Sequence, residues 1–285
     1  MPRVAVGIST YNGATRVDEL LASLEKHTKP IEGGYEVFVL DDGGKQKNFE
    51  SLKEVCGNYG VAVDRHDENV GISATWNDLT RHFDSEFMVL LNDDLILVEG
   101  WLEAMLYFAE NNHFGTAGLP MWSPRNNKKP ELGWRKIRHG WKPFLAYPKK
   151  TPLRVPAAPG PCFIFKRTLF DFIGGFDLRY WSFFEEVDFA LSLAKYGFPS
   201  FILPDPWVYH YWAKTFAENP ELGANERMEL SRSRFVAKWG ALLELAYAQT
   251  TEAIPRQELK WLFKGKPLSG LEKPINVGMK AIKVG

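Results

Sequence analysis

Two adjacent carboxylates in the segment Asn92-Asp93-Asp94 are the side chains of this 285-residue chain that most clearly suit chemistry. They directly follow the apolar run 87–91, where a buried strand would end. Neither a Gly-x-Gly-x-x-Gly motif after the first apolar run nor a Walker motif is present. A carboxylate approaches a phosphate only with a cation between them, and hard cations prefer oxygen ligands. Asp93 and Asp94 therefore predict a Mg2+ or Mn2+ ion that bridges to a diphosphate.

A second acidic cluster, Glu185, Glu186 and Asp188, follows two phenylalanines and begins a helical pattern. Glu186 and Asp188 flank the apolar stripe of that helix, and Glu185 lies opposite it. Acidic residues are common at helix N-termini, where the helix dipole stabilises each by up to about 1 kcal/mol. A carboxylate in apolar surroundings instead has a raised pKa, which suits a general base. The aromatic neighbours of this cluster favour the second interpretation.

A third candidate is His210, which lies within the aromatic stretch 207–212. A lone histidine among aromatic residues is commonly a structural one. Its place after a strand pattern equally supports contact with a metal or a diphosphate, because a neutral imidazole is a common metal ligand.

Alternating apolar runs and helical patterns must position these side chains. The predicted strands are 4–9, 35–40, 61–63, 87–91, 162–165 and 201–203, and the predicted helices are 16–27, 48–58, 72–83, 99–110, 186–196 and a stretch from 220 to about 248. Strands separated by helices indicate an α/β domain with a mostly parallel sheet flanked by helices. Residues 120–160 lose this periodicity and are predicted to be a long loop or a small excursion from the domain, and residues 261–285 carry no readable pattern.

Ligands of an open parallel sheet bind beyond the carboxyl ends of its strands. The first four predicted strands all end in small or polar residues, Thr10-Tyr11-Asn12-Gly13, Asp41-Asp42-Gly43-Gly44, Glu68-Asn69-Val70-Gly71 and Asn92-Asp93-Asp94. Such residues also favour turns. Their recurrence at four consecutive strand ends predicts one binding site at that edge, where Asp41 or Asp42 would suit a base imide or a ribose hydroxyl.

Composition sets limits on location and partners. The formal net charge is zero, so no global field attracts nucleic acid or a membrane. Two cysteines are too few for a disulfide framework. The chain begins with a strand-like run without a signal-peptide pattern, and no apolar run approaches the roughly 20 residues that span a bilayer. We therefore expect a soluble, cytoplasmic protein without a transmembrane segment, with peripheral association at a membrane surface left open.

The order and spacing of several motifs resemble glycosyltransferase family 2, which has the GT-A fold. The motifs are Ser9-Thr10-Tyr11-Asn12, Asp41-Asp42-Gly43, Glu68-Asn69-x-Gly71, Asn77, Asn92-Asp93-Asp94, Gly174-Gly175-Phe176-Asp177, Phe184-Glu185-Glu186-Val187-Asp188 and His210. The likeness is strongest to rhamnosyltransferase-like, non-processive members and covers roughly residues 3–240. The Gln-x-x-Arg-Trp motif of processive polymer synthases is absent.

The resemblance implies an inverting, metal-dependent transfer from a nucleotide-diphosphate sugar. The residues implied for the nucleoside and nucleotide are Thr10, Tyr11, Asn12, Asp41, Asp42, Asn69, Gly71 and Asn77, with Asn92 and Asp93 facing ribose or diphosphate. Asp94 takes the place of the main metal ligand, and His210 that of a histidine that contacts metal or diphosphate in some members. Glu186 takes the place of the catalytic base.

Two departures from the family pattern affect these roles. Asn92 replaces the first aspartate of Asp-x-Asp, which implies weaker metal binding. Glu186 replaces the usual aspartate, so Glu185 or Asp188 remains an alternative base.

A basic segment between Arg125 and Arg154 bears on the acceptor. It holds ten basic residues and one acidic residue, Glu131, so it carries +9 while the rest of the chain carries −9. The segment is either a solvated loop or a contact surface for an anionic acceptor. A lipid-linked phosphate at a membrane surface, a phosphate polymer and DNA with hydroxymethylated bases all fit basic residues interleaved with aromatics.

We accordingly expect a GT-A catalytic domain over residues 1–215, with 120–160 as its acceptor-side loop, and a C-terminal helical extension and tail over 216–285. The leading hypothesis is an inverting glycosyltransferase of polysaccharide or glycoconjugate assembly. The alternatives are a phage-type enzyme that glycosylates hydroxymethylated DNA bases and a non-catalytic nucleotide-sugar-binding module.

Overall fold

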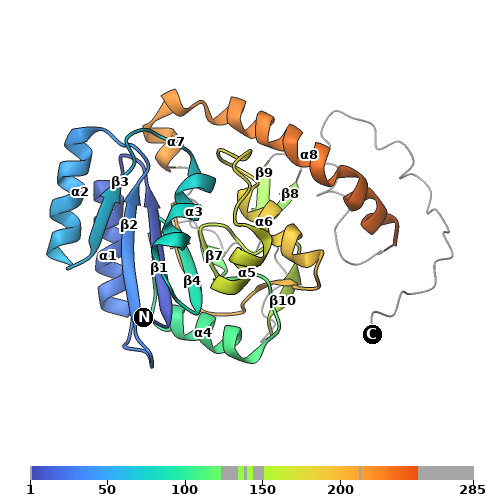
Figure 1. Ribbon diagram of the computed structural model, residues 1–285, viewed down its shortest axis with the longest axis horizontal. Coiled ribbons are helices and arrows are strands. Elements are labelled where there is room, and N and C mark those ends of the chain that lie inside the picture. Colours follow the sequence, from blue (N-terminus) through green and yellow to red (C-terminus); the bar gives the residue numbers. More distant parts are fainter. Residues whose placement is uncertain (1, 123–133, 138–139, 144–150, 212–213, 250–285) are drawn as a thin grey trace.

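An eight-stranded sheet with helices on both faces forms the centre of the computed structural model, which describes residues 2–122, 134–137, 140–143, 151–211 and 214–249 (Figure 1). The strand order along the sheet is β10-β12-β6-β11-β4-β1-β2-β3. The strands are β1 (Val4–Thr10), β2 (Tyr35–Asp41), β3 (Ala62–Arg65), β4 (Phe87–Asn92), β6 (Ala117–Gly118), β10 (Leu153–Val155), β11 (Cys162–Lys166) and β12 (Ser200–Ile202).

Four neighbouring strands, β4, β1, β2 and β3, run parallel, as the alternation of apolar runs and helices predicts. The predicted mostly parallel sheet is therefore confirmed. β11 runs antiparallel between β4 and β6. An apolar run has the same pattern in either direction, so the sequence could not predict this reversal.

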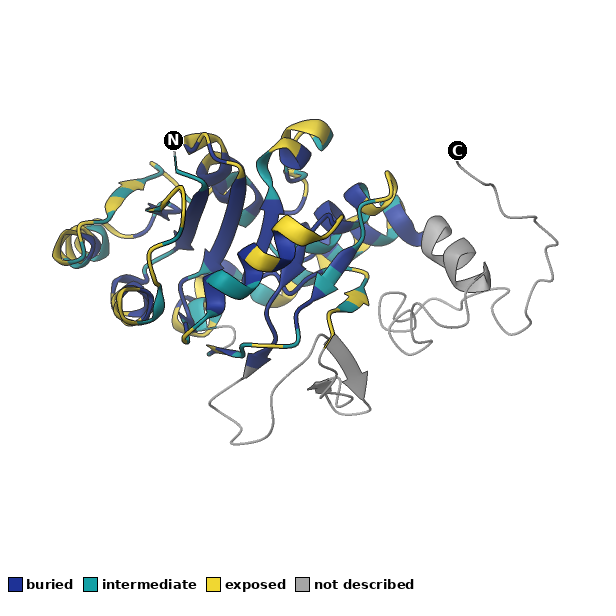
Figure 2. Cartoon of the chain, turned by 90° about the horizontal axis from the view of Figure 1, so that it is seen from below, coloured by how far each residue is buried: buried dark blue, intermediate teal, exposed yellow. Residues whose placement is uncertain are grey.

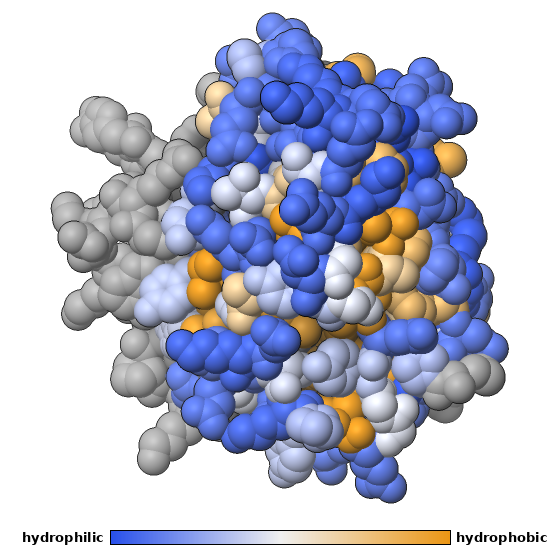
Figure 3. All heavy atoms as spheres, turned by 90° about the vertical axis from the view of Figure 1, so that its left-hand side faces the viewer, coloured by the Kyte–Doolittle hydropathy of each residue, from blue (hydrophilic) through white to orange (hydrophobic). Residues whose placement is uncertain are grey.

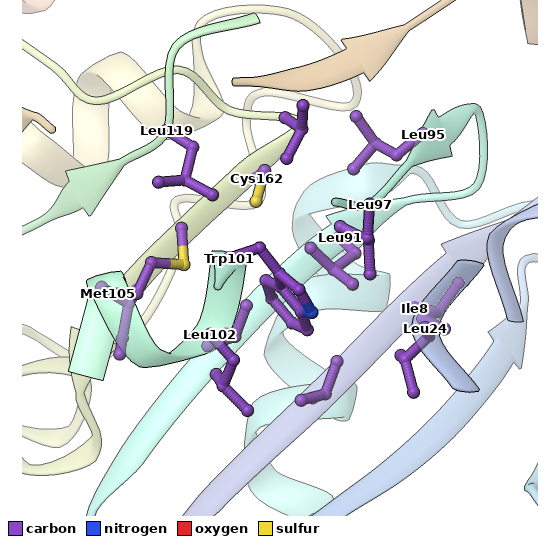
Figure 4. Packing of buried hydrophobic residues seen from close by; sticks show 14 of the residues in the cluster. Ile8, Leu24, Leu91, Leu95, Leu97, Trp101, Leu102, Met105, Leu119 and Cys162 are labelled. Carbon is purple, nitrogen blue, oxygen red and sulfur yellow. The ribbon is translucent and has the colours of Figure 1, made fainter. Parts of the chain in front are cut away.

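Two helical layers cover the sheet. One face is covered by α1 (Ala14–His27), α2 (Gln46–Asn58) and α4 (Trp101–Asn111), and the other by α3 (Ile72–His82), α5 (Arg167–Ile173) and α6 (Glu185–Ala194). β1 is buried on both sides, because Val4, Val6 and Ile8 pack against the first layer and Ala5 against the second. Figure 4 shows the first core, where Ile8, Leu91 and Trp101 lie together. Burial on both faces explains why the central strands β1 and β4 are nearly continuous apolar runs.

A small second sheet of β5 (Leu95–Ile96), β13 (Val208–His210) and β7 (Met121–Trp122) lies beside the end of β4. A two-stranded sheet is formed by β8 (Trp134–Ile137) and β9 (Gly140–Pro143). Of the two alternatives predicted for 120–160, a long loop does not describe β7, β8, β9 and β10, and the rest of the segment lies largely outside the described residues. These strands are short, and pairing with distant segments stabilises β7 and β10, which a local pattern does not reveal.

The C-terminal part contains α7 (Lys214–Glu218), a 3-10 turn η2 (Pro220–Leu222) and α8 (Ala224–Gln249), in agreement with the helical pattern predicted from 220 to 248. Phe235 and Trp239 of α8 pack on Tyr180 and Phe184 ahead of α6. Residues 261–285 lie outside the described part of the chain.

Helices present buried inner faces to the sheet and exposed outer faces to solvent (Figure 2). The face toward β3 and α2 is mostly hydrophilic, with hydrophobic atoms near its middle (Figure 3). Among the helices of the described residues, none combines the length and apolar character needed to cross a bilayer.

Candidate active site

The polar strand ends predicted to converge do lie at one edge of the sheet. Thr10 stands opposite Asp41 in the parallel pairing of β1 and β2, and Ser9 stands opposite Asn92 in that of β1 and β4. The turn that follows β3 joins this edge, because Asp42 accepts hydrogen bonds from its backbone. Strand register therefore confirms a single cluster of polar groups.

Asp94 and His210 form a buried pair beside this edge. Strands β5 and β13 pair antiparallel with His210 opposite Leu95, and Tyr211 N donates to Asp94 O at 3.0 Å. This pairing places Nε2 of His210 3.1 Å from Oδ1 of Asp94. Burial alone would raise the pKa of Asp94, but the interaction with His210 and the nearby Arg16 lower it below its ordinary value. The two residues predicted to bind a metal are thus neighbours.

Asp93 points to different partners. Its Oδ2 accepts a hydrogen bond from Thr10 Oγ1 at 2.5 Å and one from Arg16 Nη2 at 2.9 Å. Both charged side chains are 4% exposed. A methyl group at Gly13 would lie 2.2 Å from Oδ2 of Asp93, so only glycine fits against this ion pair. One carboxylate oxygen of Asp93 is therefore committed to the protein.

The two aspartates after β2 have unequal environments. Asp42 accepts from Val70 N and Gly71 N, both at 2.9 Å, and contacts His66 at 3.1 Å, so it fixes the turn after β3. Asp41 is fully buried and accepts from Gly44 N at 2.9 Å. Burial raises the pKa of Asp41 to about 6. Near pH 6 such a carboxyl group is half-protonated, so it can either accept a hydrogen bond from a ligand or donate one.

Several buried oxygens at this edge lack a partner among the described residues. They are Oδ1 of Asp41, Asn69 and Asn92 and Oε2 of Glu185. Buried polar atoms without partners are rare in native proteins, because each costs about 1–3 kcal/mol. Their concentration on predicted site residues points to a polar ligand that completes their hydrogen bonds.

Asn12 connects the edge of the sheet to the C-terminal segment. It has a left-handed backbone with φ 51°, which asparagine tolerates better than most residues. Its Oδ1 accepts from Lys45 N at 2.7 Å and its Nδ2 donates to Asn219 Oδ1 at 2.9 Å. Tyr11 lies beside it, and burial followed by the charge of Glu221 raises the pKa of Tyr11. Both side chains are half-buried at the end of β1.

Asn77 and Gly71 serve the surrounding structure. Asn77 is buried, donates to Phe176 O at 2.9 Å and accepts from Phe176 N at 2.8 Å. These bonds fix the segment that leads toward α6. Asn77 therefore has a structural role here, in place of the nucleotide contact that the family resemblance implies. Gly71 has φ 90°, and a side chain there would meet Trp181 at 2.5 Å.

Glu185 and Glu186 begin α6 after an unusual turn. Phe183 and Phe184 both adopt left-handed backbone conformations, with φ 69° and 70°. Consecutive non-glycine residues in this region carry strain, which proteins retain mainly at functional sites. Burial and then the charge of Glu186 raise the pKa of Glu185 well above its ordinary value. Burial also raises the pKa of Glu186. The pair is thus suited to hold and release a proton.

A proline-glycine-proline segment brings Glu186 close to the end of β4. Pro161 O accepts a hydrogen bond from Asn92 N at 2.9 Å. A Cβ at the adjacent Gly160 would lie 3.0 Å from Cγ of Glu186. The acidic pair and the strand-end carboxylates therefore border one site.

Asp188, the third candidate base, has structural partners. Its Oδ1 accepts from Trp239 Nε1 at 2.7 Å and its Oδ2 from Lys238 Nζ at 2.8 Å. These bonds attach α8 to α6 and engage both oxygens of a carboxyl group that is almost fully buried, so it is not accessible to an acceptor. The structure therefore argues against Asp188 as the base. The sequence could not show this, because Lys238 and Trp239 lie 50 and 51 positions further along the chain.

We expect Asp188→Ala to lower the free energy of unfolding by about 3 kcal/mol, because it leaves the indole N–H of Trp239 and the ammonium group of Lys238 without their hydrogen-bond acceptor. Urea denaturation measures this. Asp171→Ala is the control, since Asp171 is 55% exposed in its ion pair, and should change stability by less than about 0.5 kcal/mol. An Asp188→Ala protein as stable as wild type but inactive would make Asp188 the base after all.

Arg16, Glu218 and Asn219 were missed as site residues by sequence reasoning. Arg16 lies in the first turns of an amphipathic helix, where an arginine is ordinarily solvent-exposed. Its burial depends on Asp93, 77 positions away, and on Glu218, 202 positions away. No local pattern signals such pairings.

The fold and the site together define a class, the nucleotide-diphospho-sugar transferases of GT-A fold. The family described as Glycosyl transferase family 2 matches residues 5–174, more than half of the chain. The chain belongs to this family, and the predicted family and fold are confirmed.

Individual relatives agree with this assignment. An N-acetylglucosaminyl-diphospho-decaprenol L-rhamnosyltransferase of Mycobacterium tuberculosis is 25% identical over 250 residues, covering 77% of this chain and 78% of the relative. The mannosyltransferase PcManGT of Pyrobaculum calidifontis, solved with GDP-Man and Mn2+, superposes with TM-score 0.61 at 16% identity over 92% of this chain and 69% of its own. S. aureus TarS superposes with TM-score 0.56 at 19% identity over 76% of this chain, which spans 63% of that structure.

Proposed function

We propose that the protein is an inverting glycosyltransferase that moves a sugar from a nucleotide-diphosphate donor to an acceptor hydroxyl. The observation that carries the proposal is that two pairs of side chains, each with a buried carboxyl group, lie at one sheet edge. Asp94 with His210 lies on one side, and Glu185 with Glu186 lies on the other. The first pair suits a diphosphate, and the second suits a reacting hydroxyl.

The Asp94–His210 pair would suit a divalent cation whose remaining ligands are substrate phosphates. Within the described residues, no group of three or more histidine, cysteine or acidic side chains forms a metal cage. Mg2+ and related hard ions are commonly held by one or two protein ligands together with substrate phosphates. A bound Mn2+ or Mg2+ would neutralise the charge of the departing diphosphate. Asp94 and His210 would hold it.

The nucleoside would occupy the pocket edge formed by Tyr11, Asn12, Asp41 and Asn69. The unpartnered Oδ1 atoms of Asp41 and Asn69 would accept hydrogen bonds from its base or ribose. Asp42 supports this indirectly, since it fixes the turn that carries Asn69. Asn92 would contact the nucleotide from the end of β4 through its own unpartnered oxygen.

Glu186 would act as the general base. The two glutamates lie in low-dielectric surroundings, so they favour sharing one negative charge. Glu185 is almost fully buried, whereas Glu186 is half-buried and so more accessible to an acceptor. As the acceptor oxygen bonds to the anomeric carbon, its proton passes to Glu186. The bond from that carbon to the diphosphate breaks, and the diphosphate leaves with the electron pair.

For the acceptor we propose a sugar on a lipid-linked diphosphate, used at the cytoplasmic surface of a membrane. The support is the mycobacterial relative, whose name specifies such a diphosphate lipid. The basic segment 125–154 would contact the phosphates or an anionic leaflet. Most of that segment lies outside the described residues.

A thermal-shift screen tests the donor site. UDP, GDP and dTDP are each added with and without Mn2+, and we expect one of them to raise the melting temperature only when Mn2+ is present. A ligand at 100 times its dissociation constant stabilises the native state by about 2.7 kcal/mol. If no nucleoside diphosphate shifts the transition, the donor site is wrong. The anomeric configuration of the product, read by NMR, tests inversion.

A further inference from the structure

Arg16 lies almost fully buried beneath the edge of the sheet, and its guanidinium bonds residues in three other parts of the chain. Its Nη2 donates to Tyr11 O at 3.0 Å, to Asp93 Oδ2 at 2.9 Å and to Thr215 Oγ1 at 3.4 Å. Its Nη1 donates to Glu218. The guanidinium thus connects the turn after β1, the turn after β4 and α7.

Burying an arginine in this way is costly unless its bonds are made. The guanidinium stays protonated in proteins and its planar fork fixes the directions of its donors. The Arg16–Asp93 pair leaves each side chain 4% exposed, so both charges depend on each other for compensation. The position of Asp93, and with it the turn that places Asp94 against His210, is therefore set partly by Arg16.

The other end of this network covers the nucleoside residues. Asn219 is buried, donates to Thr215 O at 2.8 Å and accepts from Asn12 at 2.9 Å. Glu221 in η2 lies near enough to Tyr11 to raise the pKa of its phenol, after the larger effect of burial. Figure 1 shows α7 near the upper end of the parallel strands. The Asn12–Asn219 bond joins the segment that follows α7 to the turn after β1.

We propose that Arg16 is a positioning residue for the donor, acting through Glu218 and Thr215 to hold α7 and η2 over the nucleoside pocket. This inference rests on the proposed function, since it assumes a nucleotide between α7 and the strand ends. Through Arg16, Glu218 of α7 is connected to Asp93 in the turn that follows β4. The pocket then keeps its shape before the donor arrives, which reduces the ordering cost of binding.

Glu218→Gln is the decisive variant, because it removes the charged partner of Arg16 in α7 and leaves its bonds to Thr215 and Asp93 in place. Glu218 is 50% exposed, so its loss should leave the fold and melting temperature unchanged. We expect the dissociation constant of the nucleoside diphosphate to rise about 3- to 10-fold, as for loss of one charge-assisted hydrogen bond. Isothermal titration with UDP, GDP and dTDP, each with Mn2+, measures it. We expect kcat at saturating donor to stay within about twofold, because the network touches no reacting atom.

The matched control is Glu99→Gln, which breaks the exposed ion pair of Glu99 with Lys29 away from the site. It should leave both the melting temperature and the dissociation constant at wild-type values. Arg16→Lys adds a second arm, since an ammonium keeps the charge near Asp93 but cannot bond all the partners of the guanidinium. In the Arg16→Lys background, Glu218→Gln should have little further effect on affinity.

The outcomes separate the two proposals. Wild-type protein that binds none of the three nucleotides refutes the donor site itself. Wild-type protein that binds one, while Glu218→Gln and Arg16→Lys bind it equally well, refutes the role of Arg16 in positioning and leaves the donor site intact.

Discussion

Glu186→Gln is expected to lower kcat by about 100- to 10,000-fold, the range over which a positioned general base contributes. The amide keeps the size of the side chain but cannot take the proton of the acceptor hydroxyl. Donor binding should stay near the wild-type value, because the proposed nucleotide site lies at the strand ends. Steady-state kinetics for kcat and titration calorimetry for donor affinity separate the two effects.

Glu185→Gln is the matched variant on the neighbouring carboxyl. We expect a much smaller loss of kcat, because a buried neutral amide imitates a protonated Glu185. A loss as large as that of Glu186→Gln would mean that the pair acts as a unit, and a larger loss would make Glu185 the base. Asp188 offers no further alternative, since Trp239 and Lys238 occupy both its oxygens.

The raised pKa values of this pair also predict a pH dependence. The base must be ionised to act, so activity should fall as pH drops through a pKa above that of an ordinary glutamate. The folded state binds a proton more tightly than the unfolded chain, so stability is greatest below the unfolded pKa and falls as pH rises through the folded one. Glu185→Gln should remove part of that fall. Urea denaturation from pH 4 to 8 would show it, and parallel curves for wild type and variant would contradict the raised pKa.

Asp94→Asn is expected to abolish the Mn2+-dependent thermal shift and to lower transfer by about 1,000-fold, since a metal supplies several kcal/mol of charge stabilisation. The amide loses the charge that attracts a cation and weakens the contact with His210. The reduced shift does not depend on turnover, so it tests ion binding separately from activity. Neither Asn92 nor Asp93 should compensate, because Asp93 Oδ2 already bonds Thr10 and Arg16.

Asp64→Asn is the control for the same chemical change, because Asp64 is exposed on the edge strand β3. It should keep both the thermal shift and activity. An Asp94→Asn protein that retains the Mn2+-dependent shift would move the metal to other residues. A wild-type enzyme fully active in chelator would show that the transfer needs no metal.

The sequence by itself determined the frame of the site. Apolar runs separated by helical patterns predicted β1, β2, β3 and β4 with their helices, because periodicity reports local burial directly. The polar residues that end these strands followed from the same reading, and parallel pairing places the carboxyl ends of neighbouring strands together. Motif order then indicated the family, which the match over residues 5–174 confirms.

Only the tertiary structure decided which side chains are free to act. The short strands β5 and β13 bring His210 to Asp94, and their pairing spans more than 100 residues. Burial of Arg16 commits Asp93 to an ion pair, and α8 commits Asp188 to structural bonds. Each outcome is a contact between segments distant in sequence, set by packing of whole helices and strands. Local composition cannot report such contacts, because an acidic residue has the same pattern whether its partner is a ligand, an arginine or a tryptophan.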